Sequence, residues 1–401
     1  MNKPVFPVVL ALLAGCVEHK DPVVIGTQSL KVELVNPASG GTQSAPLPDT
    51  TRAITINVTA LDADGQLDPT FDRDVQVYSQ FLGTLTPSLE SPPLTSFHLT
   101  AGVATNQVVM LPAVFGATTL WVDDGKDADP TFATGTSETL WFRAPYIADL
   151  QTPKSETALD ALSSIPLENK QIRVEASRYG TRGRLVVTSV FSQGYTVSDV
   201  QCADDAGTPP CTAAAYDHGM VFSFSAPRDQ CGRSISEGQV IHGFAGGISE
   251  FNGLTEIGFP QSFSIEDCDH DVAAPNTARE PTPAVVDPTT WFKSLSDPSG
   301  GVINFERNEA SPIQITNGKV CPLDADYDTY KQWKIDPAGM CTPGSKNLIN
   351  VITAGTVSSV DPAALVGMTL PKVIGVLRPV NIGTFNVWII YPRSAADLVL
   401  Q

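Results

Sequence analysis

Aspartate clusters are the residues of this sequence whose types and spacing come closest to a chemical site. Two short acidic stretches, LDADGQLDPTFDRD and CPLDADYDTY, supply the candidates Asp62, Asp64, Asp68, Asp324, Asp326 and Asp328. Ca²⁺ takes about 6–8 oxygen ligands, so carboxylates gathered on a loop are candidate ligands. Neither stretch has the spacing of an EF-hand, and solvated acidic turns carry the same pattern. If the second stretch is extended, its alternate aspartates share one face. The sequence therefore predicts no cofactor, with Ca²⁺ at these aspartates as the alternative.

A catalytic constellation is not recognisable in the sequence. Only five histidines are present, and they belong to no metalloprotease, nucleophile-elbow or phosphate-loop motif. A Ser–His–Asp set can assemble from distant positions, because such triads are defined by geometry. His218 and His242 are the histidines on which we would test that idea. We therefore predict that the chain is not an enzyme and keep a hydrolase with an unrecognised active site as an alternative.

One basic cluster combines arginines with an aromatic residue, at Arg173, Arg178, Tyr179, Arg182 and Arg184. Arginine and aromatic side chains on strands can stack on bases and hold single-stranded nucleic acid. The alternative is that these arginines balance neighbouring acids, since the chain has a formal charge of −18. A negative field repels phosphate backbones at long range. The charge argues against nucleic acid as a partner, and an accessory single-stranded nucleic-acid-binding role is kept as an alternative.

The N-terminus has the layout of an export signal. Lys3 precedes the apolar stretch PVFPVVLALLAG, which is shorter than the ~20 residues that span a bilayer core. The residues LAGC ending at Cys16 resemble the lipobox of bacterial lipoprotein precursors. The resemblance implies a lipidated Cys16 as the mature N-terminus, whose acyl chains anchor the protein in a membrane. Val17 in place of aspartate implies the outer membrane. An ordinary signal peptide with a chance cysteine is the alternative.

The remaining six cysteines are even in number, as disulfide pairing in an exported chain requires. Sequence alone leaves their connectivity open. Proximity favours three pairs, Cys202–Cys211, Cys321–Cys341 and, as the remainder, Cys231–Cys268. A zinc site is disfavoured because the chain has no C-x-x-C pair and few histidines.

Strand patterns and composition predict an all-β protein. Charged residues make up 17 % of the chain, and 31 glycines and 32 prolines indicate many turns. In AITINVTALDADG, Ile54, Ile56 and Val58 alternate with polar residues, which is the period of a half-buried strand. The order of such stretches over 28–146 resembles bacterial immunoglobulin-like modules. This resemblance implies a β-sandwich that acts as a spacer or adhesive unit.

The C-terminal half indicates a repeat. The stretch GQVIHGFAGGISEFNGLTEI resembles the closing strands of OB-like barrels in secreted bacterial proteins. A second closing segment matches it at an offset of 132 residues, with Gly243 matching Gly375 and Pro260 matching Pro392. We therefore expect two OB-like β-barrels after the sandwich. One larger β domain with long insertions is the alternative.

These observations predict one order of segments. It is a signal peptide 1–15, a tether 16–27, an Ig-like β-sandwich 28–146, a connector 147–170, a first OB-like barrel 171–270, a Pro-rich linker 271–290 and a second OB-like barrel 291–401. We expect an envelope lipoprotein held at the outer membrane, periplasmic or surface-exposed. Its expected role is binding or scaffolding toward a protein or glycan partner, with the lipid as its contact to the membrane.

Overall fold

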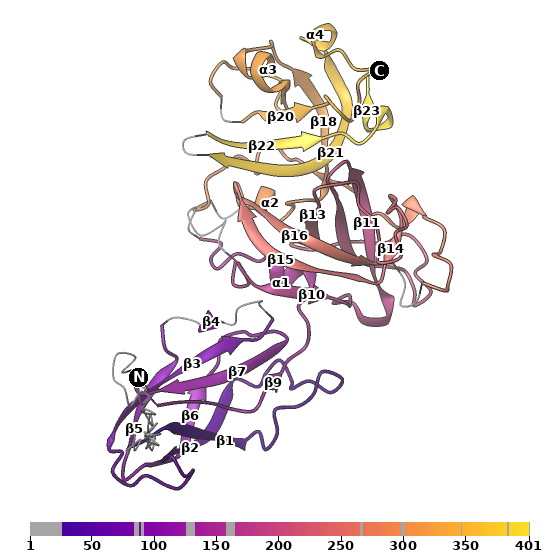
Figure 1. The fold of residues 1–401 in the computed structure, drawn as a ribbon. Helices are drawn as coiled ribbons and strands as arrows, with labels where there is room; N and C mark the ends of the chain where they lie inside the picture. Colours follow the sequence, from indigo (N-terminus) through magenta and orange to yellow (C-terminus); the bar gives the residue numbers. More distant parts are fainter. Residues whose placement is uncertain are drawn as a thin grey trace, which may run out of the picture.

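The computed structural model describes residues 26–83, 88–89, 92–125, 133–157, 165–264, 268–297, 301–345, 347–382 and 385–400. The predicted signal peptide and the lipidation candidate Cys16 lie outside these residues. Strands dominate the described chain, and the predicted all-β fold is confirmed. Figure 1 shows three assemblies of strands that follow one another in chain order.

The first assembly is a β-sandwich. One sheet contains β1 (Ser29–Asn36), β2 (Ala53–Leu61) and β6 (Val103–Met110), and the other contains β3 (Arg73–Phe81), β4 (Ser88–Leu89), β5 (Thr95–Leu99), β7 (Ala117–Asp123), β8 (Thr134–Thr136) and β9 (Leu140–Trp141). In β2, Ile54, Ile56 and Val58 are fully buried while their neighbours are half-buried, as the period of two predicts. The buried residues of both sheets form one core, which includes Val77 and Leu120.

The second assembly is a sheet that curls back on itself. It follows the short helix α1 (Ile147–Gln151) and is made of β10 (Gln171–Val174), β11 (Gly183–Phe191), β12 (Gly194–Gln201), β13 (His218–Phe222), β14 (Val240–Ile241), β15 (Gly243–Phe251) and β16 (Leu254–Phe263). The strand order is β10-β15-β16-β13-β12-β11-β14. Only His242 separates β14 at one end of this order from β15 near the other end. The chain therefore returns across the sheet at this residue and brings its two ends together.

The third assembly is a closed barrel. Its elements are β17 (Ala284–Val285), α2 (Ile303–Glu306), β18 (Pro312–Val320), α3 (Ala325–Tyr330), β19 (Gln332–Asp336), β20 (Ile349–Ile352), α4 (Pro362–Leu365), β21 (Thr369–Ile382), β22 (Phe385–Tyr391) and β23 (Leu398–Val399). The strands follow the order β18-β19-β20-β22-β21, and β21 also pairs with β18, which closes five strands into a barrel. Trp333 and Phe305 are among the large side chains buried in its core.

The second and third assemblies repeat one topology, as the matched closing segments predict. In each, the third and fifth strands pair in parallel, β13 with β16 and β20 with β22, while the other neighbouring barrel strands are antiparallel. The matched glycines lie where the fourth strand changes partners. A Cβ on Gly243 would lie 2.3 Å from the carbonyl oxygen of Val174, and a Cβ on Gly375 would lie 2.9 Å from the nitrogen of Pro392. Both positions require glycine because backbone passes too close for a side chain.

Three disulfides stabilise the second and third assemblies, which we call the first barrel and the second barrel. The pairing expected from proximity is confirmed. Cys202–Cys211 and Cys231–Cys268 lie in the first barrel, and Cys321–Cys341 lies in the second. Each such bond typically contributes about 2–4 kcal/mol. Disulfides persist in oxidising surroundings, so they indicate an extracytoplasmic environment.

Among the residues that the structure describes, none forms a helix of the length and apolarity needed to cross a membrane.

The proline-rich segment 271–290 is a strap that contacts both barrels. The Asn276 amide donates to the Gly238 carbonyl, and Arg279 Nε donates to the Gly207 carbonyl, both in the first barrel. Further along, β17 pairs in parallel with β18 of the second barrel. The segment therefore adds a short strand to the sheet that follows it, which its scarcity of strand-forming residues did not indicate.

Candidate binding cleft

An open cleft of about 720 Å³ lies on the first barrel, where β11 meets β14. The pairing of these strands involves only Leu185 and Val186 of β11, because β14 is two residues long. Beyond this pairing, the loop that precedes β11 borders the edge of the sheet. A Cβ on Gly183 would lie 1.8 Å from Ser177 Oγ, so glycine lets this loop fold closely over the strand start. The short strand and the tight loop together produce the hollow.

Polar and apolar side chains together line the cleft. Glu175, Ser177 and Arg184 come from the loop and the start of β11, His242 comes from the break between β14 and β15, and His270 follows two residues after Cys268. The Cys231–Cys268 disulfide therefore holds the segment that carries His270 against the barrel. An apolar pocket with a few convergent polar groups is the usual form of a small-ligand site.

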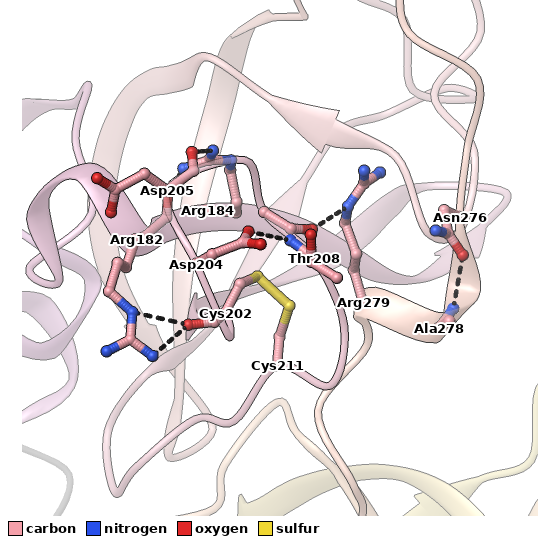
Figure 2. The surroundings of a disulfide bond; sticks show 12 residues. Arg182, Arg184, Cys202, Asp204, Asp205, Thr208, Cys211, Asn276, Ala278 and Arg279 are labelled. Atoms are coloured by element: carbon pink, nitrogen blue, oxygen red, sulfur yellow. Dashed lines mark hydrogen bonds between the residues drawn. A yellow bond between two sulfur atoms is a disulfide. The ribbon is translucent and has the colours of Figure 1, made fainter.

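One member of the predicted arginine cluster lines the cleft. Arg184 lines it, and its guanidinium donates to the carbonyls of Thr181, Gly183 and Asp205. Arg182 donates twice to the carbonyl of Cys202, at 3.0 and 2.7 Å, beside the Cys202–Cys211 disulfide (Figure 2). Both guanidiniums thus hold the loop to the turn that this disulfide closes.

The other members of the cluster face acids and rings of the protein. Arg178 Nε lies 2.8 Å from Oδ1 of the fully buried Asp217, and Tyr179 donates its hydroxyl to Oδ2 of the same carboxylate at 2.5 Å. Burial raises the pKa of Tyr179 to about 12. Arg173 pairs with Glu175 and lies over the ring of Phe263. The five residues therefore make separate contacts within the protein, and of the five only Arg184 lines the cleft.

The structure brings one serine–histidine pair together, in the interior of the first barrel. Ser198 Oγ lies 2.7 Å from His218 Nδ1, and the two residues are 0 % and 5 % exposed. Burial lowers the pKa of His218 to about 3, so the ring is neutral at physiological pH. A substrate has no access to this hydroxyl. His242, the other histidine singled out in the sequence, is exposed and lies in the cleft.

Two of the first set of Ca²⁺ candidates accept hydrogen bonds from amides and hydroxyls of the protein. Asp62 accepts the amides of Asp64 and Gln66, and Asp68 accepts the hydroxyls of Thr27 and Thr70. In all described residues, no three His, Cys, Asp or Glu side chains gather closely enough to hold a metal ion.

The same acidic stretch surrounds a histidine. Asp72 and Asp74 bracket His98, with their carboxylates 2.7 Å from Nε2 and 2.9 Å from Nδ1. The two ring nitrogens point in different directions, so the three groups do not converge on one point.

The second set of candidates adopts a conformation that its spacing did not predict. Asp324 caps the helix α3 by accepting the Asp326 amide, so the stretch is helical and not extended. Residues two apart on a helix do not share a face, and Asp328 therefore points away from Asp326. Lys334 Nζ lies 2.5 Å from Asp324 and 2.6 Å from Asp326, which neutralises part of the charge that a cation would otherwise relieve.

An exposed aromatic cluster on β13, β16 and the segment that follows β13 was not found from the sequence. The rings of Phe222, Phe224 and Phe259 follow one another with centroids 5.3 and 5.2 Å apart. Phe224 is 68 % exposed and Phe259 is 83 % exposed, with a left-handed φ of 49° at Phe259. Strained backbone of this kind is concentrated at functional sites. Nothing in the sequence distinguishes these phenylalanines from those of the core.

No protein-family model matches this chain, and a comparison with curated proteins found no match.

Proposed function

We propose that this protein is a binding protein of the cell envelope, anchored in the outer membrane through a lipid on Cys16, with its ligand site in the cleft of the first barrel. The observation that carries the proposal is the cleft itself, an open hollow lined by a carboxylate, two hydroxyls, a guanidinium and two imidazoles together with apolar side chains. This mixture suits a small polar organic ligand, such as part of a glycan or a peptide.

The remaining architecture supports this role. The described chain begins in the sandwich, and the sandwich and the second barrel lie at opposite ends of the molecule (Figure 1). A lipid that precedes the sandwich would leave the barrels farther from the membrane. The hydrogen-bonded pair of Ser198 and His218 is buried in the barrel interior, so this pair gives a hydrolase no support.

A melting-temperature screen tests the cleft. Peptides, oligosaccharides and single-stranded oligonucleotides are added to the mature protein, and a hit is measured again on His242→Trp, which fills the cleft. Thr105→Trp, at an exposed position on the sandwich strand β6, is the matched control. We expect a glycan or peptide to raise the melting temperature of wild type and Thr105→Trp only. Equal stabilisation of His242→Trp would move the site elsewhere, and a response to oligonucleotides alone would favour the nucleic-acid alternative.

The anchor is tested separately, by partition of the protein expressed with its signal peptide between detergent and water. We expect the wild-type protein in the detergent phase and Cys16→Ser in water. Wild-type protein that stays in water would reject the lipid anchor without bearing on the cleft.

A further inference from the structure

A short segment joins the two barrels. Residues 303–311 begin with α2, which lies between the barrels (Figure 1). On one side the Arg307 carbonyl accepts the Tyr216 amide of the first barrel at 2.9 Å, and on the other the Ala310 amide donates to the Leu377 carbonyl of the second barrel at 2.9 Å. We call this segment, together with the faces of β13, β15 and β16 next to it, the inter-barrel interface.

The inter-barrel interface has a small apolar core. Ala310 packs with Met220 and Leu254 of the first barrel, and all three are at least nine-tenths buried. Phe191 and Phe222 pack around them. Few apolar side chains contribute, so polar groups have a large influence on whether the two surfaces stay together.

Glutamates lie in this interface where apolar residues would be expected. Glu306 is 7 % exposed and Glu309 is 2 % exposed. Glu309 Oε1 accepts the amide of Thr255 in β16 at 2.9 Å, and the Thr255 hydroxyl donates to Oε1 of Glu250 in β15 at 2.5 Å. Thr255 therefore links a glutamate of each side, and the three carboxyl groups share one desolvated region.

The surroundings supply little positive charge. The neighbouring titratable and charged groups are Glu168, which faces Glu250, and Glu256, which faces both Glu250 and Glu309. Behind them are Arg378, which faces Glu256, and Tyr391, which faces Arg378. Arg378 faces Glu256 and lies over the rings of Phe191 and Tyr391. Arg307 is paired with Glu156 of the connector at 2.6 Å. Within the described residues, neither Glu306 nor Glu309 forms an ion pair, so their ionised forms would be buried without compensation.

Burial and mutual repulsion favour the neutral carboxyl groups. Burial raises the pKa of Glu306 to about 8 and that of Glu250 to about 7, and it raises the pKa of Glu309 well above the usual range. Repulsion by Glu250 also raises the pKa of Glu306, and repulsion by Glu306 and Glu250 raises that of Glu309. At neutral pH, the closed interface therefore keeps bound protons, whereas glutamates in water would have released them.

We propose that the inter-barrel interface is a pH-dependent contact, which is closed while Glu250, Glu306 and Glu309 hold protons and opens when they lose them. In an open state these groups meet water and titrate near the usual value of about 4.3. The closed state binds more protons above that value, so it is fully favoured below it and loses stability as the pH rises through the raised pKa values. Acid therefore fixes the relative orientation of the barrels, and alkali releases it.

Amide hydrogen exchange on the full chain tests this proposal, measured from about pH 5 to pH 9 and corrected for the intrinsic exchange rate. The reporters are the Thr255 and Tyr216 amides, whose acceptors lie across the interface. A carboxyl group with a pKa of about 7 in the closed interface and about 4.3 in water changes the opening equilibrium by about a hundredfold or more as it ionises. We expect protection of these amides to fall by that factor, while that of β2 in the sandwich stays constant.

A matched pair of variants separates the glutamates from general effects of pH. Glu309→Gln keeps an oxygen for the Thr255 amide and cannot ionise, so we expect it to flatten the pH dependence. Glu138→Gln is the control, because Glu138 accepts the Gly40 amide at 2.7 Å within the sandwich. If Glu309→Gln does not fold, Glu306→Gln carries the same expectation. Protection that does not change with pH in the wild type, or that falls equally in the glutamine variants, would overturn the proposal.

Discussion

Arg393 is the residue whose removal we expect to damage the two barrels most. Its Nη1 donates to Glu280 of the strap at 2.6 Å and to the Thr188 carbonyl of the first barrel at 2.8 Å. Its Nε and Nη2 donate to Asp397 at 3.0 and 3.1 Å. The side chains of Arg393, Glu280 and Asp397 are 17 %, 11 % and 7 % exposed, so the network is largely desolvated.

Arg393→Ala leaves two carboxylates buried without a counter-charge. Removal of one partner from a buried ion pair typically costs about 3–5 kcal/mol, because the remaining charge stays desolvated. We expect the free energy of unfolding of the second barrel to fall by that amount. The chain has several cores, and proteins with several domains generally depart from two-state unfolding, so urea-dependent amide exchange in β18 and β21 is the appropriate assay.

Two further variants give reference values for the loss of unfolding free energy. Lys31→Ala removes an ion pair with Glu33 that is about half exposed, and such pairs contribute about 1 kcal/mol or less. Arg393→Lys keeps the charge but not the planar fork, and we expect an intermediate loss. A loss for Arg393→Ala no larger than that for Lys31→Ala would refute the reasoning, since it would mean that Glu280 and Asp397 are neutral or reached by water.

Three other predictions concern single sites. Hydrogen bonds to Asp72 and Asp74 raise the pKa of His98, so its positive charge stabilises the folded state in acid and is lost as the pH rises through that pKa. The difference in melting temperature between wild type and His98→Gln should therefore be largest in acid and shrink above about pH 6.5. Ser198→Ala leaves the ring of His218 without its buried partner and should cost about 1–3 kcal/mol in urea unfolding, while ligand binding in the cleft is unchanged. Gly243→Ala brings a Cβ against a backbone carbonyl of the neighbouring strand and should cost about 1–3 kcal/mol in the same assay, whereas Gly258→Ala, whose Cβ has its nearest neighbour at 3.9 Å, should be tolerated.

The features that sequence predicts well are those set by local rules. The period of two in β2 arises because alternate side chains of a strand face the core, and Ile54, Ile56 and Val58 are the apolar residues on that face. The repeat of the barrels is visible because a strand that changes partners needs glycine, at Gly243 and at Gly375. Two disulfides follow from their spacing, since Cys202–Cys211 and Cys321–Cys341 each close a short segment, and Cys231–Cys268 follows as the remaining pair.

The features that sequence misses arise from contacts between distant segments. The cleft depends on where β14 stops, which only the pairing with β11 decides. Asp324, Asp326 and Asp328 fit an extended face equally well until the capping interaction of Asp324 starts a helix. Glu309 lies in the polar stretch FERNEASP, which has the composition of a solvated turn, and only the docking of two barrels buries it.

The two barrels are thus held by contacts that respond differently to alkali. The inter-barrel interface loses stability as its glutamates ionise, whereas the contact of Arg393 with the Thr188 carbonyl does not depend on a proton that is lost in this range. At high pH the barrels should therefore swing about the Arg393 contact without separating fully. Small-angle scattering would show this as a modest rise in the radius of gyration for wild type between about pH 5 and pH 9. A larger rise is expected for Arg393→Ala, and an equal rise in both would mean that the Arg393 contact does not hold the barrels together.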